Sequence, residues 1–458
     1  MVTQLTTPTF SIASYLAAVE QQDLTRRIGR VSQLSGLSIE VSGLNASVGE
    51  LCSIYPKQSG KRNEPAADRI LAEVVGIGAG FLTLMPYGSV QGLAAGCEVE
   101  AENSFSEIGV GYELLGRVID GFGRPLDQLP QAKTTQQRNL RATPINPLHR
   151  PRIEEVLETG VRSIDALLTL GKGQRVGIFS GSGVGKSTLL GMIARHVKAD
   201  VNVIALIGER GREVREFIDK QLGVEGLKRS VLIVATSDQP ALARMRAAYA
   251  ALAIAEFFRD EGKQVLLTMD SITRFAMARR EVGLSAGEPP TARGYTPSVF
   301  AELPELCERC GTSDSGGTIS ALMTVLVEGD DLNEPVSDSL RSILDGHIVL
   351  TRQLAHKGQY PAIDVLKSVS RVMSDIVTRE DRDLAIELVK QLAILERNRQ
   401  MVDIGAYEHG SNPILDQALL VDSELQNWLR QSDGGVARQQ AIAALRSILQ
   451  AQEVGAKK

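Results

Sequence analysis

A glycine-rich segment followed by a lysine is the part of this sequence best suited to chemistry. It reads SGSGVGKST, from Ser180 to Thr188. Glycines adopt backbone angles that other residues avoid, so successive N–H groups can turn inward around phosphate oxygens at a helix start. We expect Lys186 to reach the β- and γ-phosphates and the Ser187 hydroxyl to bind Mg²⁺. The segment predicts a nucleoside triphosphate site formed by Gly181, Ser182, Gly183, Val184, Gly185, Lys186, Ser187 and Thr188.

The strict pattern of such a phosphate-binding loop is G-x-x-x-x-G-K-[ST]. This chain departs from it at one position, where Ser180 stands in place of the first glycine. The lysine and the hydroxyl are unaffected by that change. Two other interpretations are a glycine-rich turn with an incidental lysine and a dinucleotide-binding turn. A strand-like run before the segment and a helical run after it disfavour the first, and the second does not need Gly-Lys-Ser at the helix start.

Two acidic residues follow apolar, strand-like runs elsewhere in the chain. Asp270 comes directly after residues 265–269, and Glu209 follows residues 203–207 by one glycine. Because parallel strands end at the same edge of a sheet, both carboxylates are expected beside the phosphate loop. Asp270 would then hold the Mg²⁺ shell, and Glu209 would align or deprotonate the attacking water. The alternatives are a simple turn residue for Asp270 and a salt bridge within the charged turn GERGRE for Glu209.

The elements around these residues follow three patterns. Short alternating runs from Val31 to about Glu98, separated by Gly and Pro, predict a small β-barrel. Buried strands alternating with helices predict a mainly parallel sheet covered on both faces, hence an α/β fold. After about residue 380 helix-forming residues dominate. The predicted parts are an amphipathic, partner-binding segment (1–25), the barrel (26–100), the α/β core (101–380) and a helical domain (381–458).

Composition excludes several classes of protein. The 458 residues carry 50 Lys+Arg and 55 Asp+Glu, a formal charge of −5, and aromatic residues make up 4%. Neither value favours nucleic-acid binding, so no nucleic-acid partner is expected. Four cysteines are too few for a disulfide framework, and no apolar run is long enough to cross a membrane. A soluble, cytoplasmic protein is therefore predicted.

Cys307 and Cys310 form a CERC sequence, a spacing found in zinc and redox sites. One pair cannot complete a tetrahedral zinc site, and residues three apart on a helix share one face. We therefore interpret both cysteines as packing residues. The five histidines are scattered, without metal-ligand spacing, and receive no catalytic role.

Seven ordered segments resemble the type III export ATPases, which comprise the flagellar export ATPase and its virulence-secretion relatives and are related to the catalytic subunits of rotary ATP synthases. The resemblance covers roughly residues 25–430 and implies a homohexamer of RecA-type P-loop cores, with an N-terminal β-barrel and a C-terminal helical domain. The segments are TGVRSIDALLTLGKGQR (159–175), FSGSGVGKSTLLGM (179–192), LIGERGREVREFI (206–218), MDSITRFAMARREVGLSAGEPP (269–290), GYTPSVF (294–300), ILDGHIVL (343–350) and YPAIDVLKSVSRVM (360–373).

The resemblance also implies roles for individual residues. Lys186 and Ser187 become the phosphate and Mg²⁺ contacts, and Glu209 becomes the catalytic glutamate. Asp270 becomes the second acid of the metal site. By the same resemblance Arg210 reaches the terminal phosphate, Tyr360 lies against adenine, and Arg371 is an arginine finger presented to the neighbouring subunit's nucleotide. From the residues alone, Tyr360 and Arg371 would be packing and surface salt-bridge residues.

The function implied is ATP hydrolysis with Mg²⁺, coupled to chaperone release and protein export. The flagellar system is favoured by residues 27–52 and 397–418; the alternatives are a virulence secretion ATPase, a rotary ATP synthase subunit and a Rho-type RNA translocase. Implied partners are further copies of this chain, a stalk-like regulator at the N-terminal helix, chaperones with their cargo, and an export gate. The gate would associate the protein peripherally with the inner membrane.

Overall fold

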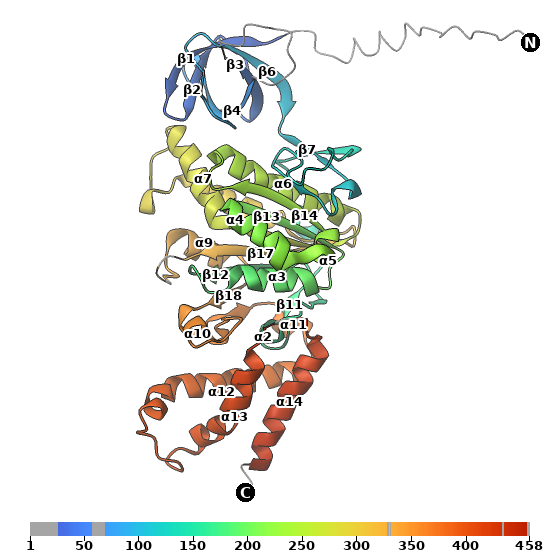
Figure 1. Cartoon of the computed structure of the whole chain (residues 1–458), viewed down its shortest axis with the longest axis vertical. Coiled ribbons are helices and arrows are strands. Elements are labelled where there is room, and N and C mark those ends of the chain that lie inside the picture. Colours follow the sequence, from blue (N-terminus) through green and yellow to red (C-terminus); the bar gives the residue numbers. More distant parts are fainter. Residues whose placement is uncertain (1–25, 57–68, 328, 330, 433–434, 456–458) are drawn as a thin grey trace, which may run out of the picture. The chain divides into compact units, whose positions relative to one another are not determined.

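The computed structural model describes residues 26–56, 69–327, 329, 331–432 and 435–455 (Figure 1). By its contacts the chain divides into two compact units, residues 1–106 and 107–458. The expected partner-binding segment, residues 1–25, lies outside the described residues.

Six strands of the first unit close into an antiparallel barrel, which confirms the predicted N-terminal domain type. Their order around the barrel is β1-β2-β5-β4-β3-β6. Ile39 and Val41 on β2 are fully buried, as alternation along a strand requires. The strands are β1 (Ile28–Ser35), β2 (Ser38–Ser42), β3 (Glu50–Tyr55), β4 (Ile70–Ile77), β5 (Phe81–Pro86) and β6 (Glu98–Phe105).

The barrel extends past residue 100, where the sequence pattern placed its end. Strand β6 keeps pairing with β3 until Phe105 lies opposite Glu50, so the first unit ends at Ser106. Leu37 lies in the turn between β1 and β2 and is exposed. The barrel's core contains Cys52 and Cys97.

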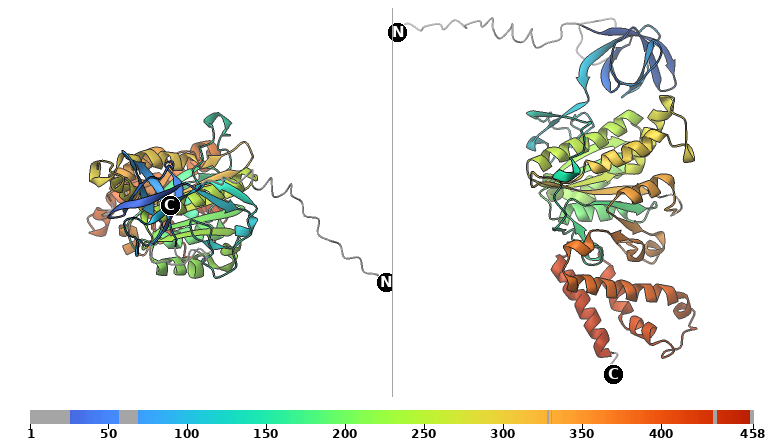
Figure 2. Two further views of the ribbon diagram at one scale, coloured as in Figure 1. Left: turned by 90° about the horizontal axis from the view of Figure 1, so that it is seen from above. Right: turned by 180° about the vertical axis from the view of Figure 1, so that it is seen from behind.

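The second unit contains a nine-stranded sheet with helices on both faces (Figures 1 and 2). The order is β19-β18-β12-β17-β15-β13-β14-β8, and β16 pairs with β17. Only β16 and β19 run antiparallel to their neighbours, so the prediction of a mainly parallel sheet is confirmed. The strands are β8 (Val118–Ile119), β12 (Arg175–Ser180), β13 (Val201–Glu209), β14 (Ser230–Thr236), β15 (Gln264–Asp270), β16 (Gly311–Thr312), β17 (Thr318–Leu326), β18 (Gly346–Leu350) and β19 (Val369–Ser370).

Burial explains why the apolar runs became central strands. Residues 201–208 of β13 are all buried, and most of helix α6 is buried around its whole circumference. Cys307 and Cys310 are buried and free, as packing residues should be. The helices of this part of the chain are α2 (Arg162–Leu167), α3 (Lys186–His196), α4 (Gly211–Glu216), a π-helix (Phe217–Leu222), α5 (Gly223–Lys228), α6 (Ala241–Asp260), α7 (Ile272–Ser285), α8 (Pro297–Glu308), α9 (Pro335–Ile343) and α10 (Arg352–His356).

Two small antiparallel pairs lie outside this sheet. The polar stretch 128–140 includes the strand β9 (Gln136–Asn139), which pairs with β7 (Glu107–Val110). The other pair joins β10 (Val156–Leu157) to β11 (Leu170–Gly171).

The carboxyl-terminal part is helical. It contains α11 (Met373–Ile376), α12 (Arg379–Asp403), α13 (Pro413–Leu429) and α14 (Arg438–Gly455). Ile442, Leu445 and Ile448 on α14 are buried in the same apolar cluster as strands β12 and β18. The helices therefore share one core with the sheet, and the contacts do not separate them at residue 381.

Candidate active site

The glycine-rich segment forms a loop between a strand and a helix. Strand β12 ends at Ser180 and α3 begins at Lys186. Gly183 and Gly185 have φ angles of 78° and 85°, in the left-handed region that favours glycine. Ser187 and Thr188 lie exposed in the first turn of α3. The loop thus leaves the N–H groups of a helix start and two hydroxyls open to a phosphate.

Lys186 is the centre of this site because its ammonium group contacts two carboxylates. The Nζ atom donates a hydrogen bond to Asp270 Oδ1 and lies 3.4 Å from Glu209 Oε1. Only 12% of the lysine side chain is exposed. Burial disfavours its charge, but the two carboxylates outweigh burial and raise the pKa of Lys186. The lysine is therefore charged at neutral pH.

Asp270 ends strand β15, which lies between β13 and β17. Its side chain is 5% exposed. Besides Lys186, the Asp270 carboxylate accepts a 2.7 Å hydrogen bond from the hydroxyl of Thr324 on β17. Neighbouring strands therefore fix the orientation of this acid at the edge beside the phosphate loop.

Glu209 reaches the same edge through an irregularity in strand β13. The pairing with β14 shifts register between Ile207 and Glu209, where Gly208 has a φ of 69°. A Cβ atom on Gly208 would lie 2.9 Å from the Cβ of Arg274, so glycine is also required for space. Such a bulge re-aims the side chain that follows it. Glu209 is consequently turned to Lys186 at the end of its strand.

Burial raises the pKa of the Glu209 carboxyl group, a hydrogen bond with Glu213 adds to this effect, and Lys186 opposes it. A carboxylate with a raised pKa is a stronger base than an ordinary glutamate.

We expect kcat/KM for ATP to fall as the pH drops through this raised pKa, because only the ionised carboxylate can accept a proton. A pH profile of kcat/KM measures the effect, since it reports groups of the free enzyme. The ATP affinity of Glu209→Gln over the same range serves as control for the titration of ATP itself. An acid limb confined to the ordinary glutamate range, below about pH 5, would contradict the prediction.

Tyr360 lies beside the phosphate loop. A Cβ atom on Gly185 would be 3.3 Å from Cδ1 and Cε1 of the tyrosine ring. The tyrosine is 46% exposed, so its ring is partly open to a ligand. The structure thus brings Tyr360 together with the loop, while its contact with adenine stays a prediction.

The side chains of the two arginines predicted to reach the terminal phosphate contact other groups in this structure. Arg210 precedes α4, its side chain is 82% exposed, and its Nη1 lies 3.6 Å from Glu213 Oε1. Arg371 follows the edge strand β19 and is exposed, and its Nη2 donates to the carbonyl of Arg341 over 3.0 Å. The expected roles of both arginines at the terminal phosphate stay predictions.

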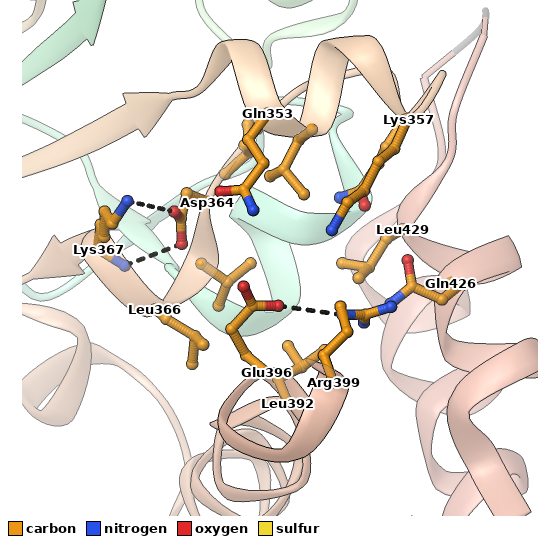
Figure 3. A pocket seen from close by; sticks show the side chains of 14 residues that line it. Gln353, Lys357, Asp364, Leu366, Lys367, Leu392, Glu396, Arg399, Gln426 and Leu429 are labelled. Atoms are coloured by element: carbon orange, nitrogen blue, oxygen red, sulfur yellow. Dashed lines mark hydrogen bonds and ion pairs between the residues drawn. The ribbon is translucent and has the colours of Figure 1, made fainter. Parts of the chain in front are cut away.

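The described part of this unit includes a cavity beside the phosphate loop and another that the loop does not line. One of about 330 Å³ borders the phosphate loop at Ser180 and Gly181; the hydroxyl of Ser180 is buried and has no hydrogen-bond partner within the described residues. The other, of about 150 Å³, lies between residues 353–367 and helices α12 and α13 (Figure 3). No residue of the phosphate loop lines this second cavity, so we assign it no part in the phosphate chemistry.

Sequence reasoning missed two contributors to the site. Thr324 gave no signal because a threonine within a strand is ordinary, and only the pairing of β15 with β17 places it at Asp270. The bulge at Gly208 could have been suspected, since an isolated glycine inside a strand pattern suggests one.

Comparisons with known proteins agree with this architecture. The nucleotide-binding domain of the ATP synthase alpha/beta family matches residues 160–370, and the T3SS EscN ATPase C-terminal domain matches residues 377–447. A flagellum-specific ATP synthase of Bacillus subtilis is 53% identical over 437 residues, covering 95% of this chain and 98% of that protein. The type 3 secretion system ATPase of Xanthomonas euvesicatoria is 47% identical over 406 residues, 89% of this chain and 90% of that one.

Among solved structures, that of the assembled ATPase EscN from the type III secretion system of enteropathogenic E. coli matches with a TM-score of 0.86 and 44% identity. The match covers 92% of this chain and 100% of that chain. The resemblance seen in the sequence motifs is thereby confirmed. The chain belongs to the family of flagellar and type III secretion export ATPases, which are ATP-hydrolysing P-loop enzymes.

Proposed function

We propose that this ATPase works as a homohexamer that hydrolyses Mg-ATP to drive protein export, with active sites completed between neighbouring copies. The observation that carries the proposal is the convergence of Lys186, Glu209 and Asp270 on one sheet edge. The chain thus holds a lysine for the phosphates, an acid for water and an acid for a metal. The side chains of Arg210 and Arg371 instead contact Glu213 and the carbonyl of Arg341.

In the proposed reaction, Lys186 exchanges its carboxylate partners for oxygens of the β- and γ-phosphates. Glu209, released from the lysine, aligns a water molecule with the γ-phosphorus and accepts its proton. The new P–O bond forms as the bond to the bridging oxygen breaks, and ADP leaves with that electron pair. The raised pKa of Glu209 suits the acceptor role.

The residues present fit a magnesium ion. Ser187 offers an exposed hydroxyl and Asp270 a carboxylate oriented by Thr324, and hard oxygen ligands of this kind suit Mg²⁺. When bound, the ion supplies charge neutralisation at the β- and γ-phosphates.

The position of Arg371 supports an active site shared between copies. Its N–H donates to the carbonyl of Asp345, just before β18 begins, whereas the phosphate loop follows Ser180, opposite Leu350 at the end of β18. Five residues of strand separate these levels by about 16 Å, more than an arginine side chain spans. Arg371 therefore suits the nucleotide of another copy better than its own.

One type of chain carrying both Glu209 and Arg371 favours a ring of identical subunits. In a rotary ATP synthase, catalytic and noncatalytic chains alternate, so that alternative is disfavoured. A Rho-type translocase is disfavoured by the family to which the chain belongs.

The flagellar system is the one we propose. The B. subtilis flagellum-specific ATP synthase is 53% identical, and that of Salmonella typhimurium is 48% identical over 440 residues. The sequence identity to the secretion ATPase of X. euvesicatoria, 47%, is only slightly lower.

The partners are proposals of the same kind. A solved structure shows EscN in complex with its central stalk EscO. For this chain we propose a stalk-like regulator bound by residues 1–25, together with export chaperones, their cargo and a membrane-bound export gate. No described helix is both long and apolar enough to span a bilayer. We propose a cytoplasmic protein that joins the inner-membrane apparatus through partners.

We expect the ATPase rate per chain to rise steeply with protein concentration, because an isolated copy lacks a neighbour's arginine. Steady-state phosphate release, measured across a dilution series alongside mass by light scattering, tests this. Full per-chain activity in a monomeric sample would contradict the shared site. An ATPase rate that rises on addition of RNA would instead support the Rho-type translocase alternative.

A further inference from the structure

Gln431 connects three segments that are distant in sequence. It lies just after helix α13 and is 5% exposed. Its side-chain Nε2 donates to the carbonyl of Gly160 over 2.8 Å, and its Oε1 accepts a 2.9 Å hydrogen bond from the N–H of Arg162. Its own backbone N–H donates to the carbonyl of Tyr360 over 2.8 Å. Gln431 is thus fixed on one side and holds Tyr360 on the other.

The segment around Gly160, to which the Gln431 side chain bonds, is tightly packed because backbones approach closely there. Gly160 has a φ of 79°, and a Cβ atom on it would lie 2.6 Å from the Cβ of His196 and 3.0 Å from the Cα of Gly435. His196 is the last residue of α3, the helix that begins at Lys186. The anchor of Gln431 is therefore packed against the far end of the phosphate-binding helix.

The residue that Gln431 holds is Tyr360, whose ring lies beside the phosphate loop. A Cβ atom placed on Gly185 would lie 3.3 Å from two atoms of the Tyr360 ring, closer than ordinary van der Waals contact. A peptide group that is held at its carbonyl cannot rotate freely, so the bond from Gln431 restricts where the attached ring can lie.

We propose that Gln431 is a positioning residue for nucleotide binding, which fixes Tyr360 at the distance from the phosphate loop that an adenine base requires. This inference rests on the proposed contact between Tyr360 and adenine. Loss of the two side-chain bonds would release residue 431 from Gly160 and Arg162, and the bond to Tyr360 would loosen with them. The adenine base would lose the aromatic ring against which it packs, while Lys186 and Glu209 would stay in place.

The experiment compares Gln431→Ala with the wild type in full-length, assembled protein. We expect the KM for ATP to rise about five- to twentyfold, the size of losing much of one base–aromatic stack. We expect kcat to stay within about twofold, because Gln431 does not touch the reacting groups. Inhibition by inorganic tripolyphosphate, which has no base, should be unchanged, and a merely structural defect would not spare it.

Gln426→Ala is the matched control. Gln426 lies on α13 and lines the cavity drawn in Figure 3, where its Nε2 donates to Asp422 over 3.3 Å. This variant removes a glutamine five residues earlier in the chain, one that does not bond to Tyr360, so its KM should equal that of the wild type. Should Gln431→Ala fail to fold, Gln431→Glu takes its place: it keeps the acceptor for Arg162, but its carboxylate cannot donate to Gly160.

Tyr360→Ala separates this inference from the proposed function. A higher KM for Tyr360→Ala but not for the Gln431 variants would overturn the positioning role and leave the adenine contact standing. An unchanged KM for Tyr360→Ala would overturn the adenine contact itself. Equal losses of ATP and tripolyphosphate binding in Gln431→Ala would also overturn the positioning role, since the phosphate site would then be affected.

Discussion

Glu209→Gln is expected to lower kcat by roughly 10²- to 10⁴-fold while ATP binding is retained, the range seen when a general base is lost. The amide matches the carboxylate in size but cannot take a proton from water. The phosphate loop is unaltered, and Asp270 still pairs with Lys186. Single-turnover phosphate release together with the affinity for a ribose-labelled fluorescent ATP analogue would measure both effects.

Glu216→Gln is the matched control for this substitution. Glu216 lies at the end of α4 and pairs at the surface with Arg212 at 3.5 Å and Lys220 at 3.3 Å. It represents the alternative interpretation of Glu209, a salt bridge in a charged turn. If Glu209→Gln turned over ATP within tenfold of the Glu216→Gln rate, Glu209 would be no more than such a bridge.

Much of this site could be predicted because it depends on local pattern. A glycine loop between a strand and a helix, and acids after apolar strands, are visible within short windows. The position of Asp270 beside Lys186 follows once the strands are parallel, since all of them end at one edge. The fold class was predictable for the same reason: the runs that form β13 and β15 are apolar on both faces.

What could not be predicted depends on pairings between distant residues. The bond from Gln431 to Gly160 joins positions 271 apart in sequence, and no local pattern marks either end. The end of the barrel was misplaced because β6 is held to Phe105 by its partner β3, while its own residues 102–104 are polar.

Arg371→Ala is expected to reduce turnover in the assembled enzyme by roughly 10³- to 10⁵-fold, the contribution of an arginine finger to phosphoryl transfer. A guanidinium stabilises the charge that develops on the transferring group. Arg371→Lys should recover only part of the rate, because an ammonium lacks the planar fork. Arg379→Ala, which removes an exposed arginine of α12 paired with Asp383 at 3.8 Å, should leave the rate unchanged.

Mixing two inactive variants tests whether Arg371 acts on its own pocket or on a neighbour's. The Glu209→Gln variant lacks the catalytic carboxylate but keeps Arg371. The Arg371→Ala variant lacks the arginine but keeps Glu209. In rings formed at random from equal amounts, about a quarter of the pockets join an intact Glu209 to a neighbour's intact Arg371, so activity should return on mixing. If Arg371 served its own chain, every pocket would lack one of the two groups and the mixture would stay inactive. Because Arg371 lies at the opposite end of β18 from the phosphate loop, we expect recovery.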